Sequence, residues 1–574
     1  MRSLRLILAR NSDSCSGWNR FSIRQPLSRM RLPTSFTVWS AGNPFSASPQ
    51  ENTGTHRMLA GGLEVREYQK KIAEVATRTN TLVVLPTGLG KTIIAILATA
   101  EMLRKYPESK VMVLAPTRPL VLQHLRAFGK ELRLPEGSLN ALTGTVDPGE
   151  REFLWTKSSI IFATPQTVYN DVRHGRVSLR DVVLAVFDEA HRSVKDYTYT
   201  KLATAYTETA TRPLIMGLTA SPGASKEKVN EIKRNLFIEA VEARTEESDD
   251  VKEYVEKTSV ETIKVAVPDE YYDTTLRLRE LYNDKVKKLL DGGFLRTSRV
   301  SKKALLEARI AISARLKSAQ ASGGPKGYIY GAIMNQAQAV AILHALEMIE
   351  TQGAPPLLRY LEKMEERPGK GKAISSLVRD PRWLKVREEA VRLASIPHPK
   401  IAVMISVVKK QLRGKPDSRV IVFTQYRDTI EDIVKALDKE GLSARRFVGQ
   451  SDREGSKGMD QQLQTQTLDL FRRGEFKVLV SSSIGEEGLH VPDVDLVVFY
   501  EAVPSEIRYI QRRGRTGRTT EGRVVILLAE GTVDESYYYS TLLKESRMRE
   551  LVKENDQKQV KKRGRNPTLM DFVS

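Results

Sequence analysis

A glycine-rich loop between an apolar run and a helical stretch constrains the fold of this chain more than any other feature. The loop follows the run Thr81–Leu85 and consists of seven residues: Pro86, Thr87, Gly88, Leu89, Gly90, Lys91 and Thr92. Glycines let backbone N–H groups turn inward around phosphates, and the helix N-terminus adds partial positive charge. We therefore predict an ATP-binding phosphate loop in which Lys91 reaches the phosphates and Thr92 ligates Mg²⁺. Because the strict pattern has glycine where Leu85 stands, a chance Gly-Lys-Thr turn is the alternative.

Short apolar runs rich in β-branched residues fall into two series, each alternating with helical stretches. The first series is Thr81–Leu85, Lys110–Ala115, Ser159–Ala163, Val182–Phe187 and Leu214–Leu218, and the second is Arg419–Thr424, Lys477–Ser482, Asp495–Tyr500 and Arg523–Leu528. Continuous apolar strands of this kind are typical of buried parallel sheets. The sequence therefore predicts an α/β fold with two parallel-sheet domains.

Between the two series, over residues 241–395, the strand signal fades and helical patterns take over. The predicted helices are Tyr271–Leu290, Lys302–Lys317 and Ile333–Glu350, and predicted loops lie at Ser322–Lys326 and Arg367–Lys372. We interpret this stretch as an inserted helical domain. The predicted organisation is 1–57 N-terminal extension, 58–240 first domain, 241–395 insert, 396–545 second domain and 546–574 flexible tail.

Two carboxylates follow the apolar run Val182–Phe187 in the sequence Asp188-Glu189-Ala190-His191. A carboxylate at the end of a buried strand beside a phosphate loop lies where Mg²⁺ needs a ligand, so Asp188 is the predicted metal ligand with Thr92. Glu189 is predicted to orient and deprotonate the attacking water. Two solvated acids at a strand end are the alternative reading.

Together these motifs resemble the superfamily 2 helicases, whose motor consists of two RecA-like domains, and the resemblance covers roughly residues 60–545. It implies that Gln69, in Arg-Glu-Tyr-Gln, reads the adenine. It also implies strand contacts in both domains and a pair that couples hydrolysis to strand movement. The implied strand contacts are Thr117, Arg118, Thr164, Pro165, Thr424, Gln425 and Ser482, and the coupling pair is Thr219 and Ser221.

The far end of the second series supplies the sequence Gln511-Arg-Arg-Gly-Arg-Thr-Gly-Arg518. A planar guanidinium stabilises the charge that spreads over the γ-phosphoryl oxygens in the transition state. We predict Arg515 and Arg518 as arginine fingers beside Gln511, and a basic nucleic-acid patch is the alternative. The resemblance also implies a nucleotide contact at Gly488. It departs at His490, where the family usually has Asp, which puts the ribose contact in doubt.

Three features indicate a branch of that superfamily: the Leu-Pro-Thr-Gly form of the loop, the sequence Arg446-Phe-Val-Gly-Gln450, and the long insert. They resemble the archaeal Hef helicases and the eukaryotic relative FANCM, which are DEAH-type helicases that process forked DNA. Only about thirty residues follow 545 and they hold no Glu-Arg-Lys-type acidic cluster, so we expect no nuclease activity in this chain.

Basic residues outnumber acidic ones by 91 to 70, which gives a formal net charge of +21. This excess suits a polyanionic partner, although solubility alone is an alternative. The stretch Asp284–Lys317 carries ten Lys or Arg and three acids. A helix with such a bias can lie along a phosphate backbone, so the insert is predicted to bind nucleic acid. A solvated helix face is the other reading.

The two ends of the chain differ from the rest. Residues 1–57 hold eight Arg and no Lys, which suits either an organellar transit peptide or, our preference, a misassigned start before Met58. The tail segment Asn566–Val573 resembles a sliding-clamp-binding peptide through Leu569 and Phe572. A chance hydrophobic end is the alternative.

The sequence therefore predicts an ATP-dependent DNA helicase or translocase that acts on forked or branched DNA in repair and stalled replication. Two rivals stay open: a double-stranded-RNA-stimulated ATPase of the RIG-I or Dicer type, and a non-enzymatic scaffold on the clamp. A single cysteine suits a reducing compartment, and no apolar run is long enough for a membrane helix. The resemblance to the archaeal Hef helicases implies a cytoplasmic, prokaryotic and archaeal protein.

Overall fold

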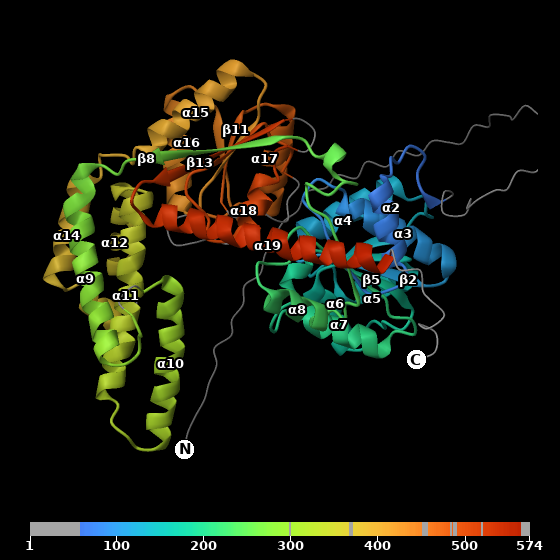
Figure 1. The fold of residues 1–574 in the computed structure, drawn as a ribbon, viewed down its shortest axis with the longest axis horizontal. Helices are drawn as coiled ribbons and strands as arrows, with labels where there is room; N and C mark the ends of the chain where they lie inside the picture. The colour runs from blue at the N-terminus through green and yellow to red at the C-terminus, as the bar shows by residue number, and fades with distance from the viewer. Residues whose placement is uncertain are drawn as a thin grey trace, which may run out of the picture. The chain divides into compact units, whose positions relative to one another are not determined.

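The computed structural model describes residues 58–297, 300–366, 371–450, 457–482, 485, 491–517 and 521–563, with side chains as far as Glu554. These residues form two parallel sheets and a group of long helices (Figure 1). The α/β fold with an inserted helical domain is confirmed. Among the described helices none is long and apolar enough to cross a membrane.

The first sheet has seven parallel strands in the order β3-β4-β2-β5-β6-β1-β7. Its strands are β1 (Thr81–Val84), β2 (Lys110–Leu114), β3 (Leu139–Leu142), β4 (Ile160–Ala163), β5 (Val182–Phe187), β6 (Ile215–Thr219) and β7 (Ala240–Ala243). The helices around it are α2 (Glu67–Ala76), α3 (Lys91–Lys105), α4 (Arg118–Glu131), α5 (Pro148–Lys157), α6 (Pro165–Arg173), α7 (Thr198–Thr209) and α8 (Lys226–Asn235). Every residue of β1, β4, β5 and β6 is buried, because the apolar core continues on both faces of the sheet.

The second sheet has six parallel strands in the order β10-β11-β9-β12-β13-β8. Its strands are β8 (Thr258–Val265), β9 (Val420–Phe423), β10 (Ala444–Phe447), β11 (Val478–Ser481), β12 (Leu496–Phe499) and β13 (Gly522–Ala529), and its helices are α15 (Lys400–Gly414), α16 (Arg427–Lys439), α17 (Gln461–Arg473), α18 (Glu506–Arg513) and α19 (Val533–Arg563). Strand β8 precedes the insert in sequence, yet it pairs along its whole length with β13. The boundary predicted at residue 241 therefore does not separate strand-forming from helical sequence, because β7 spans it and β8 follows it.

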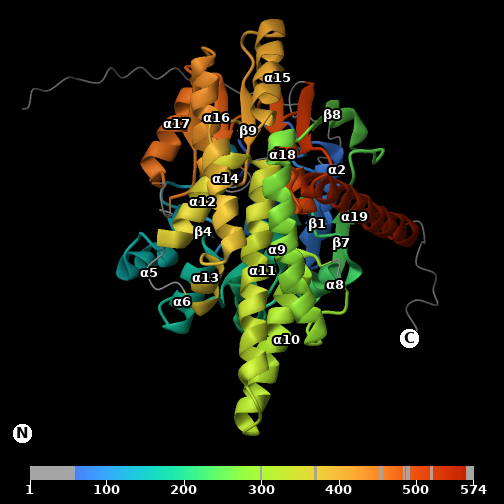
Figure 2. The same ribbon diagram turned by 90° about the vertical axis from the view of Figure 1, so that its left-hand side faces the viewer.

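The insert consists of α9 (Tyr272–Asp291), α10 (Lys302–Ala321), α11 (Gly327–Thr351), α12 (Ala354–Glu366), α13 (Lys372–Leu377) and α14 (Pro381–Leu393). Helix α11 packs along α9 and α10, and the long helices lie side by side in Figure 2. One apolar cluster surrounds the fully buried Trp383, and a second joins Leu289, Leu305 and Ile329. The three helices predicted in this stretch are confirmed, and residues 322–326 form the predicted loop between α10 and α11.

The end of the chain differs from the prediction of a flexible tail beginning at 546. Helix α19 continues to Arg563, and its side chains Met548 and Val552 are 7% and 5% exposed. Met548 belongs to the apolar core of the second sheet and Val552 to that of the first. The helix persists because these two residues, one turn apart, bury their side chains on the protein. The predicted clamp peptide at Asn566–Val573 and residues 1–57 lie outside the described residues.

A buried histidine joins the insert to the second domain. The ring of His398 is 1% exposed; Nε2 lies 3.0 Å from the carbonyl oxygen of Glu350, and Nδ1 accepts a hydrogen bond of 3.2 Å from the backbone N–H of Lys400. This pattern requires the neutral ring with its proton on Nε2. Burial, together with the nearby Lys400 charge, lowers the pKa of His398 to about 3.

Because of this buried histidine, we expect the folded protein to lose stability in acid. Between pH 6.5 and about 3 the unfolded chain binds one more proton at His398 than the folded chain does. The free energy of unfolding is therefore fully kept above pH 6.5 and falls by about 1.4 kcal/mol per pH unit as the pH drops below it. Urea unfolding at pH 7, 6 and 5 measures the slope. The variant His398→Gln keeps one donor and one acceptor but does not titrate, so its free energy of unfolding is expected to fall less steeply with pH, by the slope that one proton contributes. Equal slopes in the variant and the wild type would contradict this.

Candidate functional site

The phosphate loop has the backbone geometry that the sequence predicted. It leaves β1 and enters α3 through Gly88 and Gly90, whose φ angles are 87° and 75°. Both lie in the left-handed region that favours glycine. A Cβ on Gly90 would lie 2.4 Å from the side-chain nitrogen of Gln69, so a side chain at this position would displace the Gln69 amide. The ammonium of Lys91 donates to the carbonyl oxygens of Leu85 at 2.9 Å and Pro86 at 3.2 Å, inside the curl of the loop.

Gln69, the predicted adenine reader, is held directly against this loop. It is 3% exposed, its Oε1 accepts from the N–H of Arg66 at 3.0 Å, and its Nε2 donates to the carbonyl of Leu89 at 3.2 Å. The hydroxyl of Tyr68 donates to the same carbonyl at 2.7 Å. The first turn of α2 therefore fixes the outer side of the loop. The Arg66 guanidinium also lies 4.4 Å from the ring centre of Tyr254, which brings a flat cationic and aromatic pair to the same place.

The two predicted catalytic carboxylates stand at the end of β5. Asp188 is 8% exposed, and its Oδ2 lies 2.8 Å from Nε2 of His124 on α4. Burial raises the pKa of Asp188, but the His124 ring and the Lys91 ammonium outweigh burial and hold it below its usual value. Glu189 has a φ of 51°, a strained left-handed conformation for a non-glycine residue of a kind that clusters at functional sites. Asp188 therefore remains a carboxylate near the phosphate loop, as a Mg²⁺ ligand must.

A chain of contacts joins these carboxylates to the predicted coupling pair. Nδ1 of His191 lies 3.2 Å from Oε2 of Glu189 and 3.2 Å from the Thr219 hydroxyl. The Thr219 hydroxyl donates to the carbonyl of Ser221 at 3.0 Å. The Ser221 hydroxyl in turn lies 2.8 Å from the sulfur of Met548 on α19. The structure thus brings Thr219 and Ser221 between the carboxylates and a helix that begins in the second domain.

The arginine-rich segment after α18 lies against the phosphate loop. A Cβ on Gly514 would lie 1.9 Å from the hydroxyl oxygen and 2.8 Å from the Cβ of Thr87, so the Thr87 side chain fills the space that a side chain at 514 would need. Arg515 follows immediately; its N–H donates to the Arg512 carbonyl at 3.2 Å, and its own carbonyl accepts from Val494 at 3.1 Å. Gln511 is 5% exposed. The loop and the arginines, about four hundred residues apart, therefore meet, while Arg518, Gly488 and His490 lie outside the described residues.

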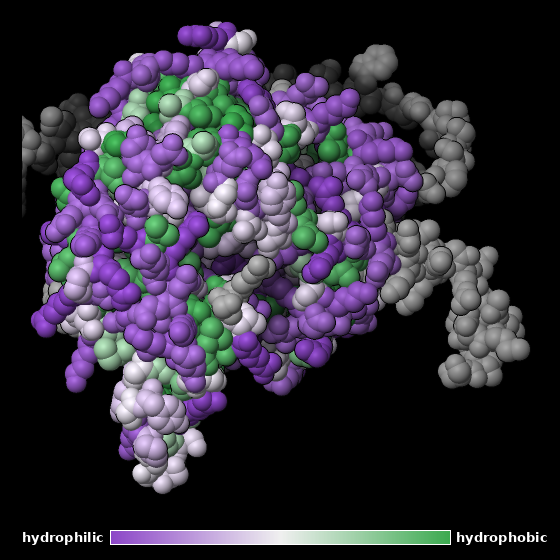
Figure 3. All heavy atoms as spheres, turned by 60° about the vertical axis from the view of Figure 1, so that its left-hand side comes forward, coloured by the Kyte–Doolittle hydropathy of each residue, from purple (hydrophilic) through white to green (hydrophobic). Residues whose placement is uncertain are grey.

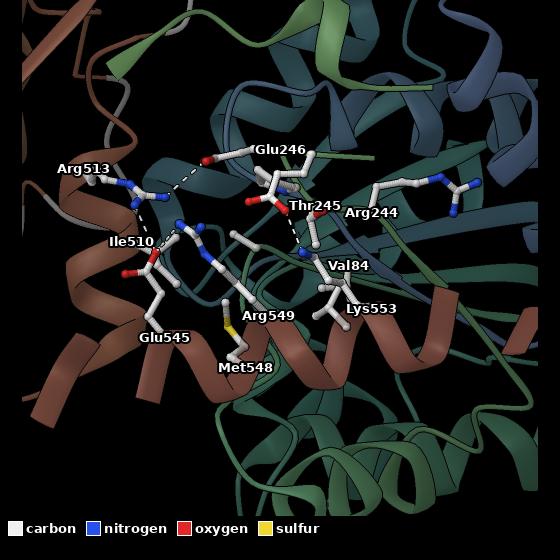
Figure 4. Close-up of a pocket in the computed structure, with 14 residues that line it drawn as sticks. Val84, Arg244, Thr245, Glu246, Ile510, Arg513, Glu545, Met548, Arg549 and Lys553 are labelled. Atoms are coloured by element: carbon white, nitrogen blue, oxygen red, sulfur yellow. Dashed lines mark hydrogen bonds and ion pairs between the residues drawn. The ribbon is translucent and has the colours of Figure 1, made fainter. Parts of the chain in front are cut away.

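A cleft opens where these elements meet. It is lined by Thr87, Gly88 and Leu89 of the phosphate loop, by residues 252 and 254–258, and by Arg513, Gly514, Thr516 and Gly517. Beside it, Arg513 pairs with Glu246 at 3.1 Å and with Glu545 of α19 at 3.0 Å (Figure 4). Figure 4 also shows Met548, Arg549 and Lys553 extending from α19 toward the first domain. Both sheets and α19 therefore contribute to the surroundings of the cleft.

The predicted strand contacts of the first domain follow two neighbouring strands. Thr117 and Arg118 follow β2 and begin α4, and Thr164 and Pro165 follow β4 and begin α6. Strands β2 and β4 pair in parallel, so these residues share one edge of the sheet. Arg118 is exposed, and the Thr164 hydroxyl lies 2.8 Å from that of Thr167. The edge matches the place where ligands bind in parallel sheets.

In the second domain the structure contradicts the predicted phosphate contact of the Thr424 side chain. Thr424 is fully buried, and its hydroxyl donates to Oε2 of Glu501 at 2.9 Å. Gln425 is half-buried, and its side-chain nitrogen donates to the carbonyl of Ala502 at 3.4 Å. Ser482 is 8% exposed. The physical reason is Glu501, a buried acceptor that takes up the donors at the end of β9.

Four residues of this region were missed by sequence reasoning: His124, Tyr199, Glu501 and Arg513. The Tyr199 hydroxyl donates to the carbonyl of Asp188 at 2.7 Å and so fixes the strand end that carries the carboxylates. Each of the four reaches the site from another element through a tertiary contact. Only Arg513 carried a local signal, because it stands inside the arginine-rich motif.

Two sheets with a phosphate loop on one and an arginine segment on the other define a nucleoside-triphosphate-dependent motor of the helicase type. Family models agree: "DEAD/DEAH box helicase" matches residues 66–229, "Putative ATP-dependent RNA helicase, helical bundle" matches residues 270–396, and "Helicase conserved C-terminal domain" matches residues 400–520. The chain is 45% identical to the Hef helicase domain of Pyrococcus furiosus, with a TM-score of 0.61, covering 83% of this chain and 98% of that one. The chain belongs to the Hef-type DEAD/DEAH-box helicases.

Curated relatives extend beyond this chain. One named "Putative ATP-dependent RNA helicase", from Methanocaldococcus jannaschii, is 41% identical over 495 residues, which cover 86% of this chain and 61% of the relative. An "ATP-dependent DNA helicase mph1" from Sclerotinia sclerotiorum is 36% identical over 498 residues, covering 82% of this chain and 40% of the relative. The chain thus spans about three fifths or less of the length of these relatives.

Proposed function

We propose that this chain is an ATP-dependent DNA helicase or translocase that processes forked or branched DNA in repair and at stalled replication forks. The observation that carries the ATPase part is the approach of Gly514 to the Thr87 side chain, because it supports a role of the neighbouring Arg515 at the phosphate loop. The DNA part rests on the 45% identity to the Hef helicase domain and on the relative named a DNA helicase. A cytoplasmic, archaeal setting is proposed from the Methanocaldococcus relative.

The residues of the cleft fit a bound nucleotide with Mg²⁺. Lys91 already lies inside the loop with its ammonium on carbonyl oxygens, and phosphate oxygens offer it stronger acceptors. The Thr92 hydroxyl and the Asp188 carboxylate would hold Mg²⁺, which, when bound, neutralises charge on the phosphoryl oxygens. Glu189 would orient the attacking water and take its proton. Arg515 and Arg518 would stabilise the charge on the transferred phosphoryl group.

The insert supplies basic side chains for a nucleic-acid backbone. Lys287, Arg296, Arg309 and Lys317 are exposed, and none of them forms an ion pair with a described residue. The protruding end of the α10–α11 arm is mainly white to purple in Figure 3, so its surface is polar to weakly apolar. Exposed Lys and Arg side chains bind phosphates without reading sequence. We propose that the insert binds the duplex part of a fork. That Asn566–Val573 binds a sliding clamp stays a separate prediction from the sequence.

A substrate panel tests the proposed function. ATPase rates and strand separation are measured on forked DNA, four-way junctions, plain duplex DNA and RNA duplex, with the Lys91→Ala variant as the inactive control. Forks and junctions are expected to stimulate hydrolysis more than plain duplex, and Lys91→Ala is expected to remove the activity. Stronger stimulation by RNA duplex would replace this proposal with the double-stranded-RNA-stimulated ATPase. A Lys91→Ala variant with full function in cells would favour the non-enzymatic scaffold.

A further inference from the structure

A buried carboxyl group outside the nucleotide cleft collects hydrogen bonds from two parts of the molecule. Glu501 stands just after β12 and is 1% exposed. Its Oε1 accepts from the backbone N–H of Gln425 at 2.6 Å. Its Oε2 accepts from the Thr424 hydroxyl at 2.9 Å and from the side-chain nitrogen of Gln352 at 3.3 Å. All three partners are donors, so the position requires a side chain with two acceptor oxygens.

The third donor belongs to the insert. Gln352 is the residue that ends α11, it is 2% exposed, and its Oε1 accepts from the Thr429 hydroxyl of α16 at 2.9 Å. The side-chain nitrogen and oxygen of Gln352 therefore both form hydrogen bonds between the insert and the second domain. Helix α11 runs from this buried end along α9 and α10, which carry three of the four basic residues proposed to meet DNA. A displacement of α11 along its axis would have to break or move the contact with Glu501.

The strand end that Glu501 fixes packs against the arginine motif. Arg512 is fully buried, with its guanidinium 5.0 Å from the ring centre of Phe423 and 5.7 Å from that of Phe499. Phe423 directly precedes Thr424, whose hydroxyl donates to Glu501, so the strand end that Glu501 fixes also carries a ring on which Arg512 packs. The backbone carbonyl oxygen of Arg512 accepts a hydrogen bond of 3.2 Å from the backbone N–H of Arg515. The position of Arg512 therefore sets where the Gly514–Arg515 segment meets the phosphate loop.

We infer that Glu501 is a positioning residue that links the insert to the arginine fingers, by holding Gln352 on one side and, on the other, the end of β9, whose Phe423 packs against Arg512. It does not touch the nucleotide. When DNA moves the insert, the change reaches Arg515 through Gln352, Glu501, the end of β9 and Arg512. The inference rests on the proposed function, since it concerns how nucleic acid regulates hydrolysis at the same site.

A purely structural role for Glu501 would predict lower stability and equal losses in every activity. The positioning role predicts a selective pattern. The variant Glu501→Gln keeps the size of the side chain but replaces one acceptor oxygen with an amide NH₂ group, which faces hydrogen-bond donors. It is expected to lower the fork-stimulated kcat about tenfold or more, while the KM for ATP and the affinity for forked DNA stay within about twofold of the wild type. Glu475→Gln, an exposed glutamate of the same domain, is the matched control.

A double-mutant cycle separates the two roles. If Glu501 acts through Arg515, adding Glu501→Gln to Arg515→Ala should lower kcat by less than about twofold further, because the residue it positions is gone. Full additivity, or a Glu501→Gln rate equal to the wild type, would overturn the inference. A wild-type protein that forked DNA does not stimulate would instead defeat the proposed function.

A second variant covers the case in which Glu501→Gln does not fold. Gln352→Met keeps the length of the side chain and removes only the link to the insert. It is expected to leave the DNA-independent ATPase within about twofold of the wild type and to lower the ratio of fork-stimulated to DNA-independent rate about fivefold. An unchanged ratio in a folded Gln352→Met protein would show that α11 does not signal through Glu501.

Discussion

Replacement of Arg515 by alanine is expected to slow ATP hydrolysis about a thousandfold while the protein still binds ATP. The physical reason is the place of this residue next to Gly514, which lies against the side chain of Thr87 in the phosphate loop. A guanidinium there meets charge that grows on the γ-phosphoryl oxygens only in the transition state, so its loss lowers kcat far more than it raises KM. Steady-state kinetics with saturating forked DNA measure both quantities.

The controls for this prediction come from the same domain. Arg515→Lys keeps the charge but lacks the planar fork, and it is expected to recover only a small part of the rate. Arg523→Ala removes an arginine whose partner is Glu261 on β8, 2.7 Å away, and it should leave kcat within about twofold, because exposed ion pairs contribute little. An Arg515→Ala protein that kept more than about a tenth of the wild-type kcat would exclude this arginine as a finger.

The inner strands of both sheets could be predicted from the sequence, and the edge strands could not. The nine predicted runs agree with observed strands to within one residue at each end. The four missed strands, β3, β7, β8 and β10, are the outermost strands of the two sheets. An edge strand is paired on one side only and is less covered, so it tolerates polar residues and lacks the continuous apolar run. The Ala-Arg-Arg-Phe of β10 and the mostly exposed β8 illustrate this.

The site was predictable where a motif is local, and not where it depends on tertiary contacts. The left-handed angles at Gly88 and Gly90 follow from their residue type and position. The burial of Thr424 does not, because it depends on Glu501, which lies 77 residues further along the chain. A hydroxyl after a strand looks the same in sequence whether it faces phosphate or a buried carboxylate. Spacing alone does not distinguish these two cases.

Loss of one partner from the buried Lys400–Asp534 pair is expected to destabilise the second domain by about 3–5 kcal/mol. The two side chains are 0% and 2% exposed and form an ion pair. Asp534 also accepts from the N–H groups of Ala502 and Ala529, each at 3.2 Å. Lys400 also donates to the carbonyl of Thr351 at the end of α11, at 3.3 Å. In Lys400→Met the Asp534 carboxylate keeps the hydrogen bonds from the two backbone N–H groups but loses the opposite charge of Lys400.

Urea unfolding followed by circular dichroism compares this change with one on the same helix. Lys409, also on α15, pairs with Glu440, and these side chains are 33% and 46% exposed. Lys409→Met is expected to cost at most about 1 kcal/mol, because water solvates the remaining charge. The double variant Lys400→Met/Asp534→Asn should cost less than the sum of its single variants, since no buried charge is left alone. Equal costs for Lys400→Met and Lys409→Met would mean that water reaches Asp534 in solution, and the buried contact between α15 and the start of α19 would then not hold the insert to the second sheet.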